Sequence, residues 1–69
     1  MIKLYTINCP NCKALESMLD KKGIEYEKIE DKDEIVEKGR EVHILSAPFL
    51  EVDGEYLKFV DAMKWASKQ

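Results

Sequence analysis

Two cysteines three positions apart carry the clearest chemical potential of this chain, in the segment Cys9-Pro10-Asn11-Cys12. A thiolate, not a thiol, attacks disulfides, and an ordinary cysteine with a pKa near ~8.5 is mostly protonated at neutral pH. The unpaired N–H groups and the dipole of a helix amino terminus favour negative charge there. A Cys-x-x-Cys pair that opens a helix is therefore typical of thiol–disulfide chemistry.

The order of the two cysteines predicts a role for each. Cys9 stands just ahead of the expected helix, so we expect its sulfur to face solvent and to attack a disulfide. Cys12 follows one helical turn later and nearer the core. We expect it to displace the reduced product from the mixed disulfide.

Metal binding and simple burial are the other interpretations of the pair. Tetrahedral zinc is held by four ligands, and the chain adds only His43 to the two cysteines as a soft or imidazole ligand. We therefore expect no metal site within one chain. A structural disulfide would close too short a loop to stabilise much, and the helix-opening position favours redox chemistry over two small buried side chains.

The elements that must position the cysteines follow from the hydrophobic pattern. Residues 2–7 are mostly apolar or β-branched and predict a buried strand. A helix is expected from Pro10, with its end marked by Gly23. Residues 24–29 predict a second strand, which would complete a parallel, right-handed βαβ unit.

The second half predicts a short helix and a hairpin. Asp31 or Asp33 could cap the helix, and Gly39 is expected to close it. After Pro48, two apolar segments joined by Asp53-Gly54 predict an antiparallel hairpin, because both central turn positions favour positive φ.

A final amphipathic helix is expected to follow, with Asp61 as its amino cap. The resulting order is β-α-β-α-β-β-α. It predicts an α/β fold with a four-stranded mixed sheet and helices on both faces.

Length and charge restrict the class of protein. The 69 residues predict one domain, residues 1–69, and 45% hydrophobic with 36% charged residues is typical of a soluble globular domain. The net charge of -3 argues against nucleic acid as the main partner. No run approaches the ~20 apolar residues of a membrane span, and the start of the chain does not resemble a secretory signal. We therefore expect a cytoplasmic protein, a compartment where cysteine pairs are more often catalytic or metal-binding than structural.

The segments YTINCPNC and SAPFLEVDG, with the final helix from about Asp61, make the chain resemble a glutaredoxin, a small member of the thioredoxin superfamily. The resemblance covers nearly the whole chain and implies a thioredoxin-like fold. In that family a cis-proline lies beside the cysteines, and the residue before it pairs its backbone with the substrate. Those positions here would be Ala47 and Pro48.

The resemblance also implies a function, namely a thiol–disulfide oxidoreductase that reduces protein or low-molecular-weight disulfides. Disulfide-containing proteins would be its substrates, with ribonucleotide reductase as one candidate, and it would act as a monomer with no bound cofactor. The catalytic residues would be Cys9 and Cys12. The substrate-binding positions would be Pro10, Asn11, Ala47 and Pro48. Lys58, which departs from the family pattern, is expected to supply a charge from another direction, and Asp61 to contact substrate from the start of the final helix.

The chain departs from glutaredoxins at three places. Residues 6–8 lack the Lys or Arg that is common there, residues 58–59 stand in place of Gly-Gly, and Asn11 replaces a tyrosine. Two electron sources therefore stay open: glutathione as a reducing cosubstrate, or a flavoprotein reductase of the thioredoxin type. A second class of function is a thioredoxin-fold binding module, or a dimer that bridges a metal or iron–sulfur cluster through Cys9 of each subunit without turnover.

Overall fold

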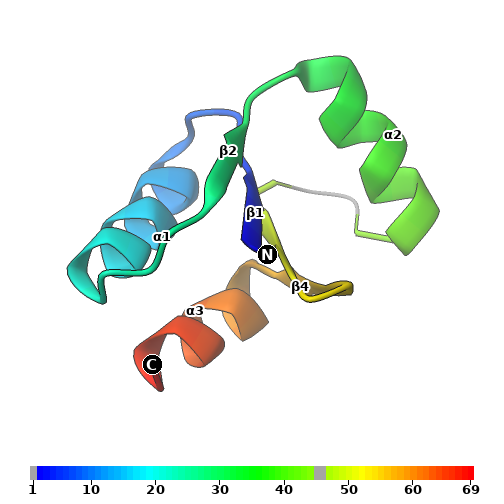
Figure 1. Cartoon of the computed structure of the whole chain (residues 1–69). Helices are drawn as coiled ribbons and strands as arrows, with labels where there is room; N and C mark the ends of the chain where they lie inside the picture. Colours follow the sequence, from blue (N-terminus) through cyan, green and yellow to red (C-terminus); the bar gives the residue numbers. More distant parts are fainter. Residues whose placement is uncertain (1, 45–46) are drawn as a thin grey trace.

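The computed structural model describes residues 2–44 and 47–69. Its elements, in chain order, are β1 (Ile2–Tyr5), α1 (Pro10–Lys21), β2 (Glu27–Ile29), α2 (Lys32–Val42), β3 (Phe49–Val52), β4 (Glu55–Lys58) and α3 (Phe59–Ser67) (Figure 1). The predicted α/β class and the β-α-β-α-β-β-α order are confirmed, and both are compatible with a thioredoxin-like fold. Within the described part of the chain, no helix has the length and apolar character needed to cross a membrane.

The four strands form one mixed sheet in the order β2-β1-β3-β4. β1 pairs in parallel with β2, whereas the β1–β3 and β3–β4 pairs are antiparallel. Tyr5, the last residue of β1, lies opposite Phe49, the first residue of β3. This register places the segment that leads to Cys9 beside Pro48, which immediately precedes β3.

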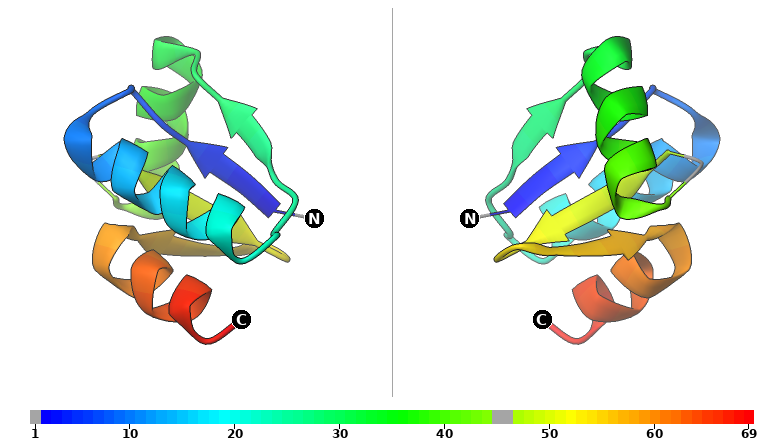
Figure 2. Two further views of the ribbon diagram at one scale, coloured as in Figure 1. Left: turned by 90° about the vertical axis from the view of Figure 1, so that its left-hand side faces the viewer. Right: turned by 90° about the vertical axis from the view of Figure 1, so that its right-hand side faces the viewer.

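Helices cover both faces of the sheet: α1 and α3 lie on one face, and α2 lies on the other (Figure 2). Successive strand residues point to opposite faces, so Leu4 and Tyr5 of β1 enter different cores. Leu4 joins fully buried leucine and alanine side chains beneath α1 and α3, namely Leu15, Leu19, Leu50, Ala62 and Ala66.

The core beneath α2 is aromatic and β-branched. Its buried residues are Tyr5, Ile29, Ile35 and Phe49. The rings of Tyr5 and Phe49 stack with their centroids 4.5 Å apart. The cross-strand pair of β1 and β3 is therefore also an aromatic pair, of the kind that stabilises a sheet.

The end of α1 explains why β2 is shorter than predicted. Beyond the helix, Gly23 has a φ of 69°, and its N–H donates to the carbonyl of Asp20 at 3.1 Å. The N–H of Ile24 donates to the carbonyl of Leu19 at 3.0 Å. These two bonds form a Schellman motif. Because the N–H of Ile24 is used in this motif, Ile24 belongs to the end of the helix. The prediction of a strand over residues 24–29 is therefore wrong at its start, and β2 begins only at Glu27.

The amino cap of α2 is Asp31, whose carboxylate accepts the N–H groups of Asp33 at 3.0 Å and Glu34 at 3.2 Å. The predicted stop at Gly39 is wrong, because α2 continues to Val42. Gly39 instead permits a close approach: a Cβ built on it would lie 2.6 Å from the carbonyl oxygen of Ile44.

The hairpin is confirmed, with φ values of 49° at Asp53 and 88° at Gly54. The predicted cap of the last helix is wrong. α3 begins at Phe59, directly after β4, and its cap residue Lys58 makes no side-chain capping bond. Asp61 lies inside the first turn instead, where its negative charge is favourable near the helix dipole.

Candidate functional site

Cys9 caps the amino terminus of α1 with its own sulfur. Its backbone is extended, with φ -94° and ψ 169°, and Pro10 begins the helix. The backbone N–H of Cys12 donates to Sγ of Cys9 at 3.2 Å. Cys9 thus holds the position that a Ser or Asp cap oxygen takes in other helices, and its sulfur is half-buried.

Cys12 lies beneath this cap and is fully buried, which confirms the predicted order of accessibility within the pair. Both cysteines are free thiols. Burial opposes ionisation of Cys12, whereas hydrogen bonds with the Cys9 thiol, the Thr6 hydroxyl and the backbone of Cys9 and Ile7 favour it. The hydrogen bonds prevail, so the pKa of Cys12 is lowered from its ordinary value.

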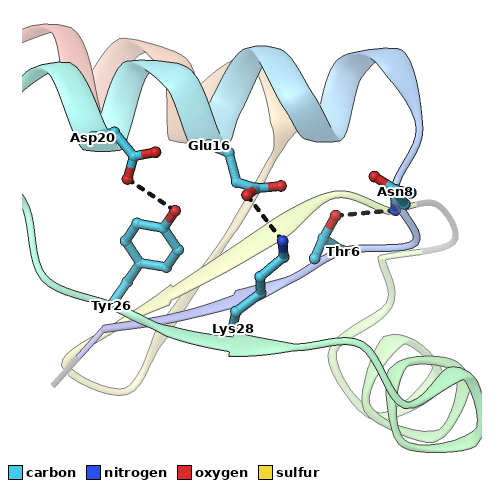
Figure 3. A network of polar contacts seen from close by, with 6 residues as sticks. All are labelled: Thr6, Asn8, Glu16, Asp20, Tyr26 and Lys28. Carbon is cyan, nitrogen blue, oxygen red and sulfur yellow. Dashed lines mark hydrogen bonds and ion pairs between the residues drawn. The ribbon is translucent and has the colours of Figure 1, made fainter.

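The loop between β1 and α1 is held by Thr6, a residue that the sequence pattern placed in the strand and gave no role. Its N–H donates to the carbonyl of Ile29 at 3.0 Å, and its Oγ1 accepts the N–H of Asn8 at 3.2 Å (Figure 3). Asn8 has a φ of 63°, a conformation that asparagine tolerates better than most residues. The only sequence signal for Thr6 was a hydroxyl within an otherwise apolar, buried run.

Pro48 lies beside this loop, as the β1–β3 register requires. The Ala47–Pro48 peptide bond is cis, which confirms the prediction made for it. Pro48 is fully buried and Ala47 is half-buried. Ser46, the first residue of the SAPFLEVDG segment, lies outside the described residues.

The other expected substrate-binding residues lie in three different elements, α1, β4 and α3. Pro10 and Asn11 are exposed in the first turn of α1. Lys58 is exposed and lies opposite Phe49 in the β3–β4 ladder, so the sheet brings it near Pro48. Asp61 is exposed farther along, in the first turn of α3, and α1 and α3 begin at the same end of the sheet (Figure 2).

A groove of about 420 Å³ adjoins the site on the side of α2. Its apolar lining includes Ile7, Ile35, Val36, Ile44, Ala47 and Phe49. The charged residues that line it are both cations, Lys32 and Arg40. Ile7 stands two residues before Cys9, and its side chain is 54% exposed. The prediction of a buried strand over residues 2–7 is wrong at its end, because β1 stops at Tyr5 and Ile7 is exposed.

Within residues 2–44 and 47–69, no group of three or more His, Cys, Asp or Glu side chains is arranged to hold a metal ion. His43, the third potential ligand, is exposed at the carboxyl cap of α2 with a φ of 61°. The cysteines stand at the start of α1, on the opposite face of the sheet from α2.

Comparison with protein-family models and with curated proteins finds no match for this chain. Membership of the glutaredoxin family therefore stays a prediction from the two quoted segments. The support for a function comes from the position of the thiols, their hydrogen bonds and the groove beside them.

Proposed function

We propose that this protein is a glutaredoxin-like thiol–disulfide oxidoreductase that reduces protein or low-molecular-weight disulfides in the cytoplasm. The observation that carries the proposal is the hydrogen bond from the N–H of Cys12 to Sγ of Cys9 at the start of α1. The thiolate is the form of a cysteine that attacks a disulfide, and this sulfur faces a backbone N–H of the first helical turn. The second thiol lies directly behind it and is shielded from solvent.

The reaction proceeds in two exchanges. The Cys9 thiolate attacks one sulfur of the substrate disulfide, forms a mixed disulfide and releases the first substrate thiolate, which takes a proton from water. Cys12 loses its proton and attacks Sγ of Cys9, forming the Cys9–Cys12 disulfide and releasing the second substrate thiolate. The protein dithiol supplies both electrons, and an external reductant restores it.

The surroundings of the pair suggest how a substrate is held. The backbone of Ala47 is a candidate partner for an extended substrate segment, and the apolar groove that begins at Ile7 is suited to the side chains of such a segment. An apolar Ile7 in place of a cation supports protein disulfides as substrates and a flavoprotein reductase as electron source. Glutathione is the competing electron source, with Lys58 as the nearby cation.

The proposal is tested by measuring reduction of a peptide disulfide with two reductant systems, glutathione with its reductase and NADPH with a thioredoxin-type reductase. We expect turnover with at least one of them. Cys9→Ser should reduce the rate to that of the uncatalysed reaction. Cys12→Ser should accumulate a mixed disulfide on Cys9, visible by mass spectrometry. Ala14→Ser, at an exposed position of α1, is the matched control and should keep the wild-type rate.

Two outcomes would overturn the proposal in different ways. Equal residual activity of the two cysteine variants would contradict the assigned roles. Absence of turnover with both reductants, together with a stoichiometric coloured cluster in protein purified without oxygen, would establish the cluster-bridging alternative instead.

A further inference from the structure

The groove beside α2 combines exposed apolar surface with positive charge. Three large apolar side chains are exposed among the described residues, and two of them, Ile7 at 54% and Val36 at 47%, line this groove. The charged residues in its described lining are Lys32 and Arg40, although the chain as a whole has a net charge of -3. A surface of this composition is complementary to an apolar side chain that is flanked by carboxylates.

Both cations of the groove are available to a ligand. They are exposed, and none of the ion pairs between described residues involves Lys32 or Arg40. Three carboxylates lie in the vicinity. Glu30 lines a separate hollow beside Lys32, and Asp33 and Glu37 line another hollow on α2. All three are exposed and none of them lines the groove, so a carboxylate bound there would meet cations.

The spacing of the two cations restricts the shape of the ligand. Lys32, Val36 and Arg40 follow one another at intervals of four residues and all line the groove, so they share one face of α2. With a rise of about 1.5 Å per residue, the backbone positions of the two cations are about 12 Å apart. An extended chain advances about 3.3 Å per residue and turns every second side chain to the same face. Its residues i and i+4 are therefore about 13 Å apart on one face, with residue i+2 between them.

We propose that the groove binds an extended segment of a disulfide-containing substrate protein, in which two acidic residues four positions apart flank an apolar residue midway between them. The two carboxylates pair with Lys32 and Arg40, and the apolar side chain packs against Ile7 and Val36. The inference rests on the proposed function and deepens it by naming the class of substrate.

The groove continues toward the thiol pair at one end. A hollow of about 360 Å³ shares Ile7 and Lys32 with the groove and also touches Asn8, the residue before Cys9. The Lys32 end of the groove is therefore the end nearer the attacking sulfur. We expect the substrate cysteine to stand beyond the acidic residue that pairs with Lys32, on the side away from Arg40.

The experiment uses peptides whose one cysteine forms a disulfide with pyridinethiol, and protein that has been reduced beforehand. Release of pyridinethiol, followed by stopped-flow absorbance, gives the second-order rate constant. One series carries Glu-Ser-Leu-Ser-Glu before the cysteine and a second series carries it after the cysteine. The comparison peptides replace both Glu by Gln, both Glu by Lys, or Leu by Ser. A further peptide, Ser-Glu-Leu-Glu-Ser, keeps the composition but turns the carboxylates to the face opposite the leucine.

We expect the Glu-Ser-Leu-Ser-Glu peptide to react fastest in one of the two series. Its rate constant at low salt should exceed that of the Gln peptide by about 3- to 10-fold, the range for two exposed ion pairs. The Leu-to-Ser peptide and the Ser-Glu-Leu-Glu-Ser peptide should both be slower. The advantage over the Gln peptide should shrink at high salt, because exposed charges are screened.

Protein variants test whether the two cations cause this preference. Lys32→Glu combined with Arg40→Glu should reverse it, so that the Lys peptide reacts faster than the Glu peptide. Lys64→Glu combined with Lys68→Glu is the matched control. These two lysines are exposed at the end of α3, the helix on the other face of the sheet (Figure 2), and their reversal changes the net charge equally. The control should keep the wild-type preference. Each result is a ratio of two rates for one protein, so a general loss of activity does not alter it.

Three results would overturn the inference. They are equal rates for the Glu and Gln peptides, a Ser-Glu-Leu-Glu-Ser peptide as fast as the first, and a wild-type preference in the charge-reversed protein. Competition by S-methylglutathione that is lost in the charge-reversed protein would also overturn it, because the two cations would then serve glutathione. The proposed function stands in all these cases if the wild type reduces hydroxyethyl disulfide, which is small and uncharged. A wild type that reduces neither this disulfide nor any peptide would contradict the proposed function, and the inference with it.

Discussion

The two faces of the sheet are built differently. Beneath α1 and α3 the core is aliphatic and closed, with its buried leucine and alanine side chains at 0% exposure. Beneath α2 the core is an aromatic stack with two isoleucines, and a groove of about 420 Å³ lies along the helix. The face beneath α1 and α3, here called the closed face, holds α1 in place. The face beneath α2, here called the open face, leaves apolar surface in contact with solvent.

This difference assigns separate tasks to the two faces. Cys12 lies on the buried side of α1 in one stripe with Leu15 and Leu19, so docking of α1 against the closed face also fixes the second thiol. Ile7, Val36 and Ala47 border the groove on the other face. The proposed chemistry therefore depends on the closed face, and the proposed recognition of substrate depends on the open one.

The largest expected difference between the faces is in the cost of removing a core side chain. Leu15→Ala should lower the free energy of unfolding by about 2–5 kcal/mol, because the cavity forms in a closed core. Ile35→Ala should cost less, near the lower end of that range, because Ile35 already lines the groove. Urea unfolding followed by circular dichroism measures both values.

Val60→Ala is the control for this pair, since Val60 is 54% exposed and should change stability by less than about 0.5 kcal/mol. Equal losses for Leu15→Ala and Ile35→Ala would show that the α2 face is as tightly closed as the other. The division between the faces would then not hold.

A smaller effect is expected at Gly39, which sets how closely α2 and the chain after it approach each other. The N–H of Ile44 donates to the carbonyl of Gly39 at 2.9 Å, and an added Cβ would meet the Ile44 carbonyl oxygen at 2.6 Å. Because the obstacle is backbone, it must shift. Gly39→Ala should therefore lower the free energy of unfolding by about 1–3 kcal/mol, despite the higher helix propensity of alanine.

Glu37→Ala, an exposed position on the same helix, is the matched control and should be nearly neutral in urea unfolding. A Gly39→Ala protein as stable as the wild type would indicate that the backbone at Ile44 can shift at little energetic cost. The shape of the groove, which Gly39 and Ile44 both line, could then change.

The sequence predicted those features that depend on neighbouring residues. The helix after Pro10, the Asp53-Gly54 hairpin and the alternating strands each have a local cause in propensity or turn chemistry. The predicted helix end at Gly39 was wrong because this glycine has a non-local cause. A side chain at position 39 would collide with the backbone of Ile44, and only the folded chain shows that contact.

The candidate site shows the same limit. The cysteine motif and the cis bond before Pro48 were predicted, because the motif has a fixed spacing and the bond follows from a family resemblance. Thr6 and the groove at Ile7 were missed, because their roles depend on which segments the sheet brings together. A hydroxyl within an apolar run looks like an ordinary β-branched residue until the N–H that it accepts, here that of Asn8, is known.

The smallest predicted effect compares one tyrosine from each face. Burial, followed by the charge of Glu51, raises the pKa of Tyr5 on the α2 face to about 12. Burial, followed by a hydrogen bond to Asp20, raises the pKa of Tyr26 beside α1 to about 12 (Figure 3). Both phenols ionise near pH ~10 in the unfolded chain, so the folded state binds more protons between about pH 10 and 12. Their contribution to stability is complete below that window and is lost as the pH rises through it.

Tyrosinate absorbance against pH measures both pKa values when each carboxylate is neutralised in turn. Asp20→Asn should lower the pKa of Tyr26, because it removes the charge from an acceptor 3.1 Å from the hydroxyl. Glu51→Gln should lower the pKa of Tyr5 but leave it above the ordinary value, because the ring is only 2% exposed. A Tyr5 that returned to the ordinary value in Glu51→Gln would mean that water reaches this ring. The opening of the α2 face would then extend past the groove to the stacked pair at the centre of the sheet.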